Sequence, residues 1–288
     1  MLVPQSYLQY HPNAEARQRA KGFLVSIAII YPLYIFFLWW LWYSKSPQAP
    51  FHFFNDMSEW LQMDKVGHAV VQFQNTMMPA FIFCWAGFEP KKSALFALLF
   101  SFLALAPIEV FDGFSVSWGF SWGDMLANAL GSLFAYLQMR GWNSIVVLPK
   151  FSFHQTIYAL ARPDMFGVDY IQNSLKDYNG QTYWFTFDIN RLIGKKILPS
   201  WLLLSLGYGA EGMYGGHDNV WTDKDGVVQD FSNVGRYRQF YISFDINFDP
   251  LVKNQKLKRW LYPLNIFKLP FPALEISEKG LQFHWLYL

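Results

Sequence analysis

Hydrophobic positions run without interruption in one long segment near the start of the chain. From Gly22 to Tyr43 there is no charged residue, and a helix of this length spans about 33 Å, enough to cross the hydrocarbon core of a bilayer. Basic residues precede the segment and aromatic residues end it, namely Arg17, Arg19 and Lys21 and then Trp39, Trp40, Trp42 and Tyr43. These flanks predict a cytoplasmic N-terminus. The segment is too long for a signal peptide and no small-residue cleavage site follows, so we predict a membrane anchor.

Three weaker apolar segments follow, and each contains some polar residues. They are Val66–Phe88, Ser93–Val110 and Trp122–Met139. Lys91 and Lys92 lie in a tight connection and Arg140 follows the last segment, which favours four membrane spans with both ends in the cytoplasm. The alternative is three amphipathic helices that form a bundle against a membrane face.

After Lys150 the hydrophobic pattern changes to a period of two. In Phe240–Phe248 every second residue is apolar, which predicts a strand whose polar residues form one wet face. Three further segments read as strands, namely Gln181–Asn190, Trp201–Met213 and Leu281–Tyr287. Glu278–Gly280 predicts a hairpin turn, and Asp223–Gly226 predicts a loop tip between long strands. We expect about six strands in an open sheet or small sandwich, because a closed membrane barrel needs at least eight.

The predicted fold class is an α+β membrane protein. An N-terminal transmembrane helix and a hydrophobic helical bundle are followed by an antiparallel β-rich domain. The corresponding regions are 1–45 for the anchor, 46–148 for the helical region and 149–288 for the β-rich domain.

Polar residues gather at corresponding ends of the three weaker segments. Asp64, Lys65 and His68 open the first, Glu109 and Asp112 close the second, and Ser121, Asp124 and Asn128 open the third. Up–down–up connectivity places these groups at the same end of a bundle. Within each group the residues are three or four apart and share a helix face. His68, Gln72 and Asn75 continue one polar stripe, and ionisable groups at membrane depth usually face one another or a cavity.

Two kinds of role remain open for this cluster. As a functional site, it would use His68, Glu109, Asp112 and Asp124 in catalysis and Asp64, Lys65, Ser121 and Asn128 in binding. His68 with carboxylates could also bind a divalent metal, but no two-histidine motif supports one and no cofactor is predicted. As structure, Asp64 would cap a helix, Ser121 and Asp124 would form a capping box, and Asp112–Gly113 would make a turn.

Gly119–Gly123 matches G-x-S-x-G, the nucleophile elbow of α/β hydrolases. That elbow requires a strand before the serine and a parallel sheet beneath it. Here a loop rich in serine and tryptophan precedes Ser121, so we reject a serine hydrolase.

Composition narrows the class of protein. Aromatic residues make up 20% of the chain and charged residues only 15%, with a formal net charge of +2. A soluble domain carries about 25% charged residues, and no basic run indicates nucleic-acid binding. The single cysteine, Cys84, excludes an internal disulfide and reads as a buried thiol.

The motifs of the polar cluster also carry a resemblance. DKVGH, then E-x-x-D-G, then G-x-S-W-G-D-x-x-x-N-x-x-G over Gly119–Gly131 resembles the YfiM-like family of bacterial lipoproteins, whose function is unknown. LKDYNGQTYW and GYGAEGMYGG extend the likeness into the second half. The chain lacks the N-terminal cysteine of the lipoproteins, so its first segment would replace the lipid anchor. A fainter similarity is to VanZ-like membrane proteins, through the D-K-x-x-H opening and the later D-x-x-x-N-x-x-G.

These observations predict an envelope membrane protein with a structural or assembly role. The alternative is a membrane hydrolase or transferase acting on a lipid-linked substrate, with His68 as acid–base and Glu109, Asp112 and Asp124 as its partners. Expected partners are the lipid bilayer and other envelope proteins. We expect the inner membrane, with association with the outer membrane or the periplasmic face as the alternative. Four spans would leave the β-rich domain in the cytoplasm, whereas the lipoprotein resemblance favours the periplasm.

Overall fold

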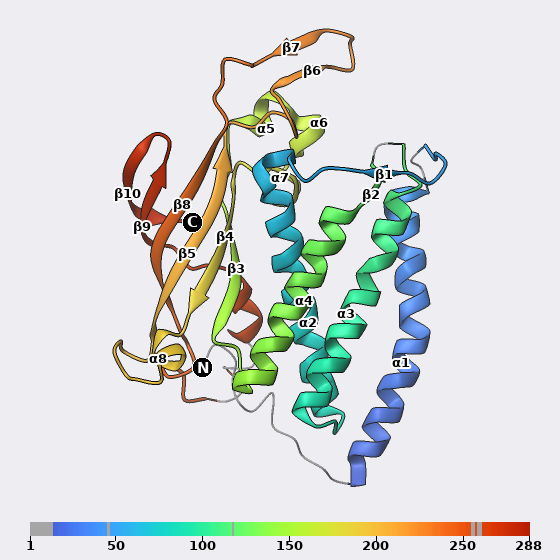
Figure 1. Cartoon of the computed structure of the whole chain (residues 1–288), viewed down its shortest axis with the longest axis vertical. Coiled ribbons are helices and arrows are strands. Elements are labelled where there is room, and N and C mark those ends of the chain that lie inside the picture. Colours follow the sequence, from blue (N-terminus) through green and yellow to red (C-terminus); the bar gives the residue numbers. More distant parts are fainter. Residues whose placement is uncertain (1–13, 45–46, 117, 255–256, 258–260) are drawn as a thin grey trace. The chain divides into compact units, whose positions relative to one another are not determined.

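The chain divides into two compact units, shown in Figure 1. This computed structural model describes residues 14–44, 47–116, 118–254, 257 and 261–288. The helical unit comprises the described residues up to Met57 together with His68–Ile145, and the β unit comprises Ser58–Gly67 and Val146–Leu288. Helix α2 begins in the β unit and continues in the helical unit.

The helical unit contains four long helices and one very short pair of parallel strands. Its elements are α1 (Ala14–Leu38), a π-helical turn (Trp39–Tyr43), β1 (Phe53–Phe54), α2 (Met63–Trp85), α3 (Pro90–Asp112), β2 (Phe120–Ser121) and α4 (Trp122–Trp142). The four predicted apolar segments therefore form helices, each with slightly different bounds. Pro90 lies in the first turn of α3, where its missing N–H is not needed, and Asn143 ends α4 in the left-handed conformation.

Two of the described helices are long and apolar enough to cross a membrane, α1 over Glu15–Phe37 and α3 over Pro90–Asp112. Helices α2 and α4 do not meet the same criteria. The same length and composition also occur in signal sequences near an N-terminus and in buried core helices. The number of spans therefore stays a prediction.

Specific contacts attach α1 to the other helices of its unit. Pro107 in α3 has no N–H to donate to the carbonyl of Leu103, four residues earlier. The hydroxyl of Tyr31 in α1 donates to that carbonyl instead, at 2.9 Å. At the other end of α1, the guanidinium of Arg19 donates to the carbonyl of Trp85 at 3.0 Å. Helix α1 is thus integrated into the hydrogen bonding of the helical unit.

The β unit is built on a six-stranded antiparallel sheet in the order β10-β9-β8-β5-β4-β3. Its elements are a 3₁₀ turn (Glu59–Gln62), β3 (Val147–Phe153), α5 (Tyr158–Ala161), α6 (Pro163–Phe166), α7 (Tyr170–Lys176), β4 (Gln181–Phe187), α8 (Ile189–Ile193), β5 (Leu202–Glu211), β6 (Val220–Thr222), β7 (Val228–Asp230), β8 (Tyr237–Ile246), a second 3₁₀ turn (Tyr262–Ile266), β9 (Phe271–Ser277) and β10 (Gly280–Tyr287). The α+β class and the antiparallel β-rich second half are confirmed.

Several details of the predicted β region are wrong. About six strands in one sheet or a small sandwich were predicted, and in the described residues the six strands form one sheet and not a sandwich. The strand predicted to reach Asn190 ends at Phe187, because the side chain of Asp188 accepts from the Arg191 N–H and caps α8. The loop tip at Asp223 joins strands of three residues each, not long ones. The three short helices α5 to α7 lie in a stretch for which alternation was predicted.

The orientation of β8 reverses the expected one. Its polar positions Tyr241, Ser243 and Asp245 are buried, whereas its apolar positions, such as Phe240 and Ile242, are exposed. The prediction of a wet polar face is therefore wrong. The buried polar groups have partners inside the unit, and the Nζ of Lys150 lies 2.8 Å from the Oδ2 of Asp245. A polar interior is stable only when its charges are paired in this way.

Candidate functional site

Three helices of the helical unit bring four of the predicted site residues together. His68 comes from α2, Glu109 from α3, and Asp124 and Asn128 from α4. The Nδ1 of His68 lies 3.2 Å from the Oδ1 of Asn128, and the Nδ2 of Asn128 donates to the Oε1 of Glu109 at 3.2 Å. On the other side of the ring, the Nε2 of His68 lies 3.5 Å from the Oδ1 of Asp124. Each ring nitrogen therefore faces an oxygen of α4.

The four side chains differ in their access to solvent. The side chain of His68 is 31% exposed, whereas that of Glu109 is only 3% exposed and that of Asp124 is 10% exposed. The imidazole is therefore the group of this set that a solute could reach. If Nδ1 carries the proton of the neutral ring and donates a hydrogen bond to Asn128, the unprotonated Nε2 directs its lone pair towards Asp124. An imidazolium, or a water or cation between the two atoms, satisfies both groups.

Helix α4 is fixed at its start by a cap. Ser121 is the N-cap, and its Oγ accepts from the backbone N–H of Asp124 at 3.0 Å. The same hydroxyl donates to the Oδ1 of Asp56 at 2.6 Å. The predicted cap at Ser121 is therefore present, and Asp124 lies within it while its carboxylate also faces His68. Capping and site formation are not alternatives here.

Close packing of α2 and α4 sets the distance between His68 and Asn128. A Cβ added at Gly131 would lie only 2.2 Å from the carbonyl oxygen of Ala69. Ala69 follows His68 directly, and Gly131 lies about one turn after Asn128. Because glycine has no Cβ, the two backbones can approach at this level.

Below this cluster, a second group of polar side chains continues between the same helices. The Nε2 of Gln72 donates to the Oγ of Ser132 at 2.8 Å. The Oγ1 of Thr76 lies 2.7 Å from the Oγ of Ser101 and 3.1 Å from the Oγ of Ser132. We call the two groups together the polar seam. Its members are His68, Gln72 and Thr76 of α2, Ser101 and Glu109 of α3, and Asp124, Asn128 and Ser132 of α4.

The seam differs from the predicted stripe at one position. Asn75 is exposed, and Thr76 takes the place that was predicted for it. His68, Gln72 and Thr76 repeat at intervals of four residues, which keeps them on one helix face. Ser132 continues the interval of Asp124 and Asn128, so the same spacing was available as a signal for Thr76 and Ser132. The third seam residue that sequence reasoning missed is Ser101 of α3.

The remaining predicted site residues have partners of their own. The Oδ1 of Asp112 accepts from the hydroxyl of Tyr43 at 2.7 Å. Asp64 and Lys65 belong to the β unit, where the Lys65 Nζ lies 2.7 Å from the Oδ2 of Asp64. There the hydroxyl of Tyr178 also donates to the Oδ1 of Asp64 at 2.6 Å. The functional role of the eight predicted residues stays a prediction.

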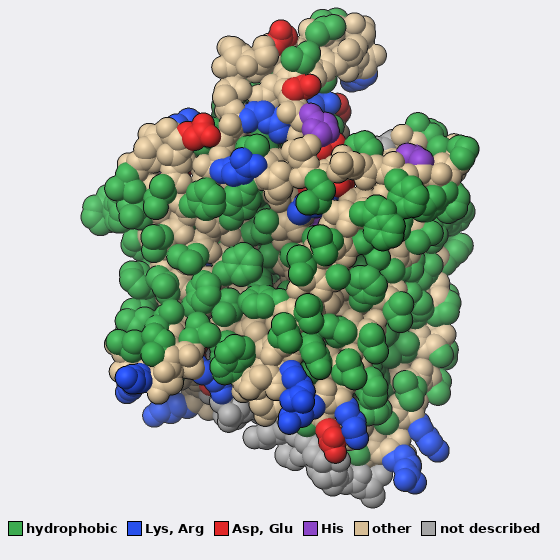
Figure 2. Space-filling view, viewed as in Figure 1, with side chains coloured by type: hydrophobic (Ala, Val, Ile, Leu, Met, Phe, Trp, Pro, Cys, Tyr) green, Lys and Arg blue, Asp and Glu red, His purple; other side chains and the backbone are tan. Residues whose placement is uncertain are grey.

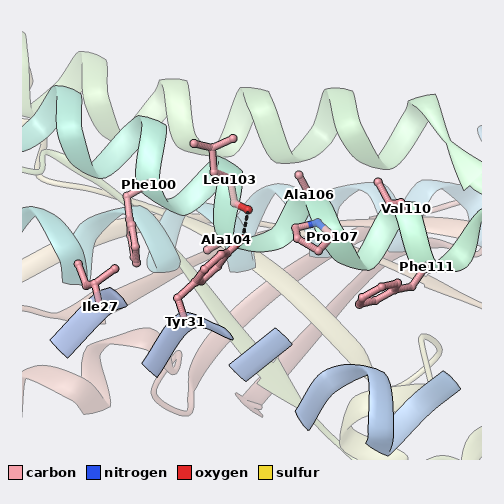
Figure 3. A pocket seen from close by; sticks show the side chains of 9 residues that line it. All are labelled: Ile27, Tyr31, Phe100, Leu103, Ala104, Ala106, Pro107, Val110 and Phe111. Carbon is pink, nitrogen blue, oxygen red and sulfur yellow. Dashed lines mark hydrogen bonds between the residues drawn. The ribbon is translucent and has the colours of Figure 1, made fainter. Parts of the chain in front are cut away.

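An apolar groove between α1 and α3 is a separate feature of the helical unit (Figure 3). Its volume is about 580 Å³. The residues that line it are Ile27, Tyr31, Phe100, Leu103, Ala104, Ala106, Pro107, Val110 and Phe111. The hydroxyl of Tyr31 and the carbonyl of Leu103, both at this groove, are hydrogen-bonded to each other, as Figure 3 shows. A groove with this lining suits an apolar ligand, and among these lining residues only Tyr31 has an ionisable side chain.

The comparison with protein families gives one match. A family described as "Predicted periplasmic lipoprotein (DUF2279)" matches residues 52–140, about a third of the chain. This range contains every predicted site residue and the whole polar seam. No curated protein and no solved structure matches the chain.

The match confirms the resemblance to a lipoprotein family at this general level. The description gives a compartment and no activity, so it supports association with the cell envelope. The likeness to YfiM-like and VanZ-like proteins stays a prediction.

Proposed function

We propose that the chain is a membrane-anchored protein of the bacterial cell envelope, in which the polar seam joins α2, α3 and α4 and supports a structural or assembly role. The observation that carries this proposal is the position of the seam. It is a hydrogen-bonded run of mostly buried polar groups between helices whose outer residues are apolar and exposed. In a bilayer, polar side chains of this kind connect helices where hydrophobic burial cannot.

The outer surface of the helical unit supports insertion into lipid. Large apolar side chains are exposed along three of its helices, including Ile29, Leu33 and Phe36 of α1, Leu99 and Leu103 of α3, and Leu126 and Leu130 of α4. Figure 2 shows hydrophobic side chains covering this part of the molecule, with Lys and Arg side chains at the end where α1 begins. In water, an apolar surface of this extent would favour aggregation.

Retention of α1 is part of the proposal. A cleaved signal sequence would leave the carbonyl of Leu103 without the donor that Tyr31 provides. It would also expose the groove that α1 shares with α3. Extraction of cell membranes with alkaline carbonate tests the anchor: an integral protein of full length stays in the pellet, whereas a shortened soluble product would contradict the proposal.

A second candidate function rests on the exposure of His68. Its imidazole is accessible and has a carboxylate near each ring nitrogen, Glu109 at 3.8 Å and Asp124 at 3.5 Å. This arrangement suits a general acid–base acting on a lipid-linked envelope substrate. Asp112 was also predicted to take part, and its Oδ1 accepts from the hydroxyl of Tyr43.

Substitutions that keep side-chain size separate the two functions. We would express H68Q and D124N in cells that lack the native protein, with N75A as a control on the exposed face of α2. The structural role predicts that both seam variants have lower membrane abundance and lower thermal stability, and that any envelope defect accompanies this loss. The enzymatic role predicts stable, abundant H68Q and D124N proteins that fail to correct the defect, and this outcome would overturn the structural role.

For the finer location, we propose the inner membrane. Asp225, at the exposed tip of the β6–β7 turn, provides a reporter for the compartment of the β unit. A D225C variant without Cys84 would be treated in whole cells with a thiol reagent that does not cross the inner membrane. Labelling in intact cells would place the β unit in the periplasm or outside. Labelling only after lysis would place it in the cytoplasm, as four spans predict.

A further inference from the structure

The six-stranded sheet has one polar and one apolar face, and the apolar face is the exposed one. Along β8, the side chains of Tyr237, Gln239, Tyr241, Ser243 and Asp245 are buried. The alternate residues include Phe240, which is 52% exposed, and Ile242, which is 43% exposed. A sheet in water has the opposite arrangement, with apolar side chains inside and polar ones outside.

Strand pairing extends this pattern across the sheet. Ile242 of β8 pairs with Leu206 of β5 on one side and with Leu274 of β9 on the other. Leu274 in turn pairs with Phe283 of β10. Paired residues of antiparallel strands project from the same face, so these four side chains form one apolar row over four strands. Leu206 and Phe283, towards the two ends of the row, are 42% and 55% exposed.

The opposite face carries a paired polar network, so the inversion is stabilised from inside. The Nε2 of Gln239 donates to the Oε1 of Glu275 at 3.1 Å, and the Nε2 of His284 lies 2.8 Å from the other carboxylate oxygen. The buried pair of Lys150 and Asp245 lies further along the same face. Polar residues inside and apolar residues outside are the arrangement of strands that face lipid.

Strand length and flanking charge indicate which apolar environment fits this face. Strands β5 and β8 are each ten residues long, within the 9–11 residues that a strand needs to cross a bilayer. Exposed basic residues flank both ends of these strands: Lys195, Lys196 and Lys253 at one end, Arg238 and Lys279 at the other. Basic side chains at such positions complement the phosphates of lipid headgroups.

We propose that the outer face of the six-stranded sheet, which carries Leu206, Ile242 and Phe283, contacts the hydrocarbon of a lipid bilayer. This assigns a lipid surface to the β unit itself, beyond the helical anchor. A protein partner fits the face less well, because protein interfaces place polar groups around and within their apolar centre. Figure 2 shows hydrophobic side chains over these strands, with Lys and Arg side chains at the lower edge.

Spin labels on the full-length protein test the proposal. Single cysteines at Ile242 and Phe283, in a C84A background, would carry the label, and the protein would be reconstituted into vesicles of phosphatidylcholine and phosphatidylglycerol. The matched control is a cysteine at Val228, an apolar residue of the β6–β7 hairpin that is 63% exposed. Circular dichroism before and after labelling checks that each variant is folded. Because two positions on the outer face are labelled separately, the test remains possible if one of the two variants does not fold.

Power-saturation EPR would compare collisions of each label with oxygen, which concentrates in lipid, and with a water-soluble nickel complex. We expect oxygen collisions to exceed nickel collisions at Ile242 and Phe283, and the reverse at Val228. Nickel collisions at Ile242 and Phe283 that equal those at Val228 would show a face in water and overturn the proposal. Low collisions with both reagents would show a face covered by protein, which overturns it as well.

Discussion

Replacement of Asn128 by alanine is the most direct test of the polar seam. Asn128 is 3% exposed and connects the other members of the upper cluster, because its Oδ1 lies 3.2 Å from the Nδ1 of His68 and its Nδ2 donates to Glu109. In N128A both contacts are lost. Glu109, which lies in the interior with a side chain 3% exposed, loses a donor that water cannot easily replace.

The expected magnitude follows from these two contacts. A hydrogen bond in a folded protein contributes about 0.5–1.5 kcal/mol, and one to a charged group about 1.5–3 kcal/mol. The contact with Glu109 belongs to the second kind, whereas exposure of His68 to solvent reduces the loss on its side. We therefore expect N128A to lower the free energy of unfolding by about 2–3 kcal/mol. At about 2–4 °C per kcal/mol, this corresponds to roughly 4–12 °C in Tm.

The chain offers a matched control for this substitution. Asn75 is exposed on α2, so N75A removes the same atoms from a helix without removing a seam contact. Alanine has a higher helix propensity than asparagine, and this gain is common to both variants. The difference between N128A and N75A therefore isolates the contribution of the seam.

The single cysteine provides the assay. Cys84 is buried in α2, so a fluorogenic maleimide reacts with it only when the helical unit opens. Heating the purified protein in detergent with this reagent gives a Tm for each variant. By the same scaling, a difference in Tm of about 1–2 °C or less between N128A and N75A corresponds to at most about 1 kcal/mol. That result would refute the argument that the seam holds the three helices together.

Three further predictions concern other contacts. In G131V the new Cβ would lie against the carbonyl oxygen of Ala69, so we expect the same maleimide assay to show a Tm lowered by more than in N128A, or no folded protein. Y31F removes the donor to the carbonyl of Leu103 and should cost about 1 kcal/mol, measured as a Tm loss that Y34F, on the same helix, does not show. Burial lowers the pKa of Lys268 to about 8 from 10.5. The unfolded chain then binds more protons than the folded one between these values, so stability should rise as pH increases from about 8 to 10.5; K268M should remove this rise in urea unfolding measured across that range.

The helices of this chain could be predicted because their signals are local. The long apolar run to Tyr43 and the interval of four residues that starts at His68 are both visible in the sequence. The interval from His68 also reaches Thr76, and the interval from Asp124 reaches Ser132, but the predicted stripe contained Asn75 in place of Thr76. Only the observed burial separates these neighbours, since they lie about 100° apart on the helix.

The membership of the site depended on contacts that no local pattern carries. Asp112 is spaced correctly for the cluster, yet Tyr43, about seventy residues earlier, provides its partner. Asp64 and Lys65 are close to His68 in sequence but belong to the other unit. Tyr43 for Asp112 and Tyr178 for Asp64 are partners distant in sequence, and sequence spacing gives no information about them.

The sheet shows a more general limit. A period of two predicts that polar and apolar residues lie on opposite faces, and β8 has this period. The period does not state which face is inside, and the prediction of a wet polar face assumed that water was the solvent. Lys150 and Asp245, nearly one hundred residues apart, reverse that assignment because each neutralises the charge that the other buries. Because the buried pair fixes the polar face of the sheet inside the unit, the apolar face is exposed, and an apolar environment suits it better than water. The spin-label measurement determines whether that environment is lipid.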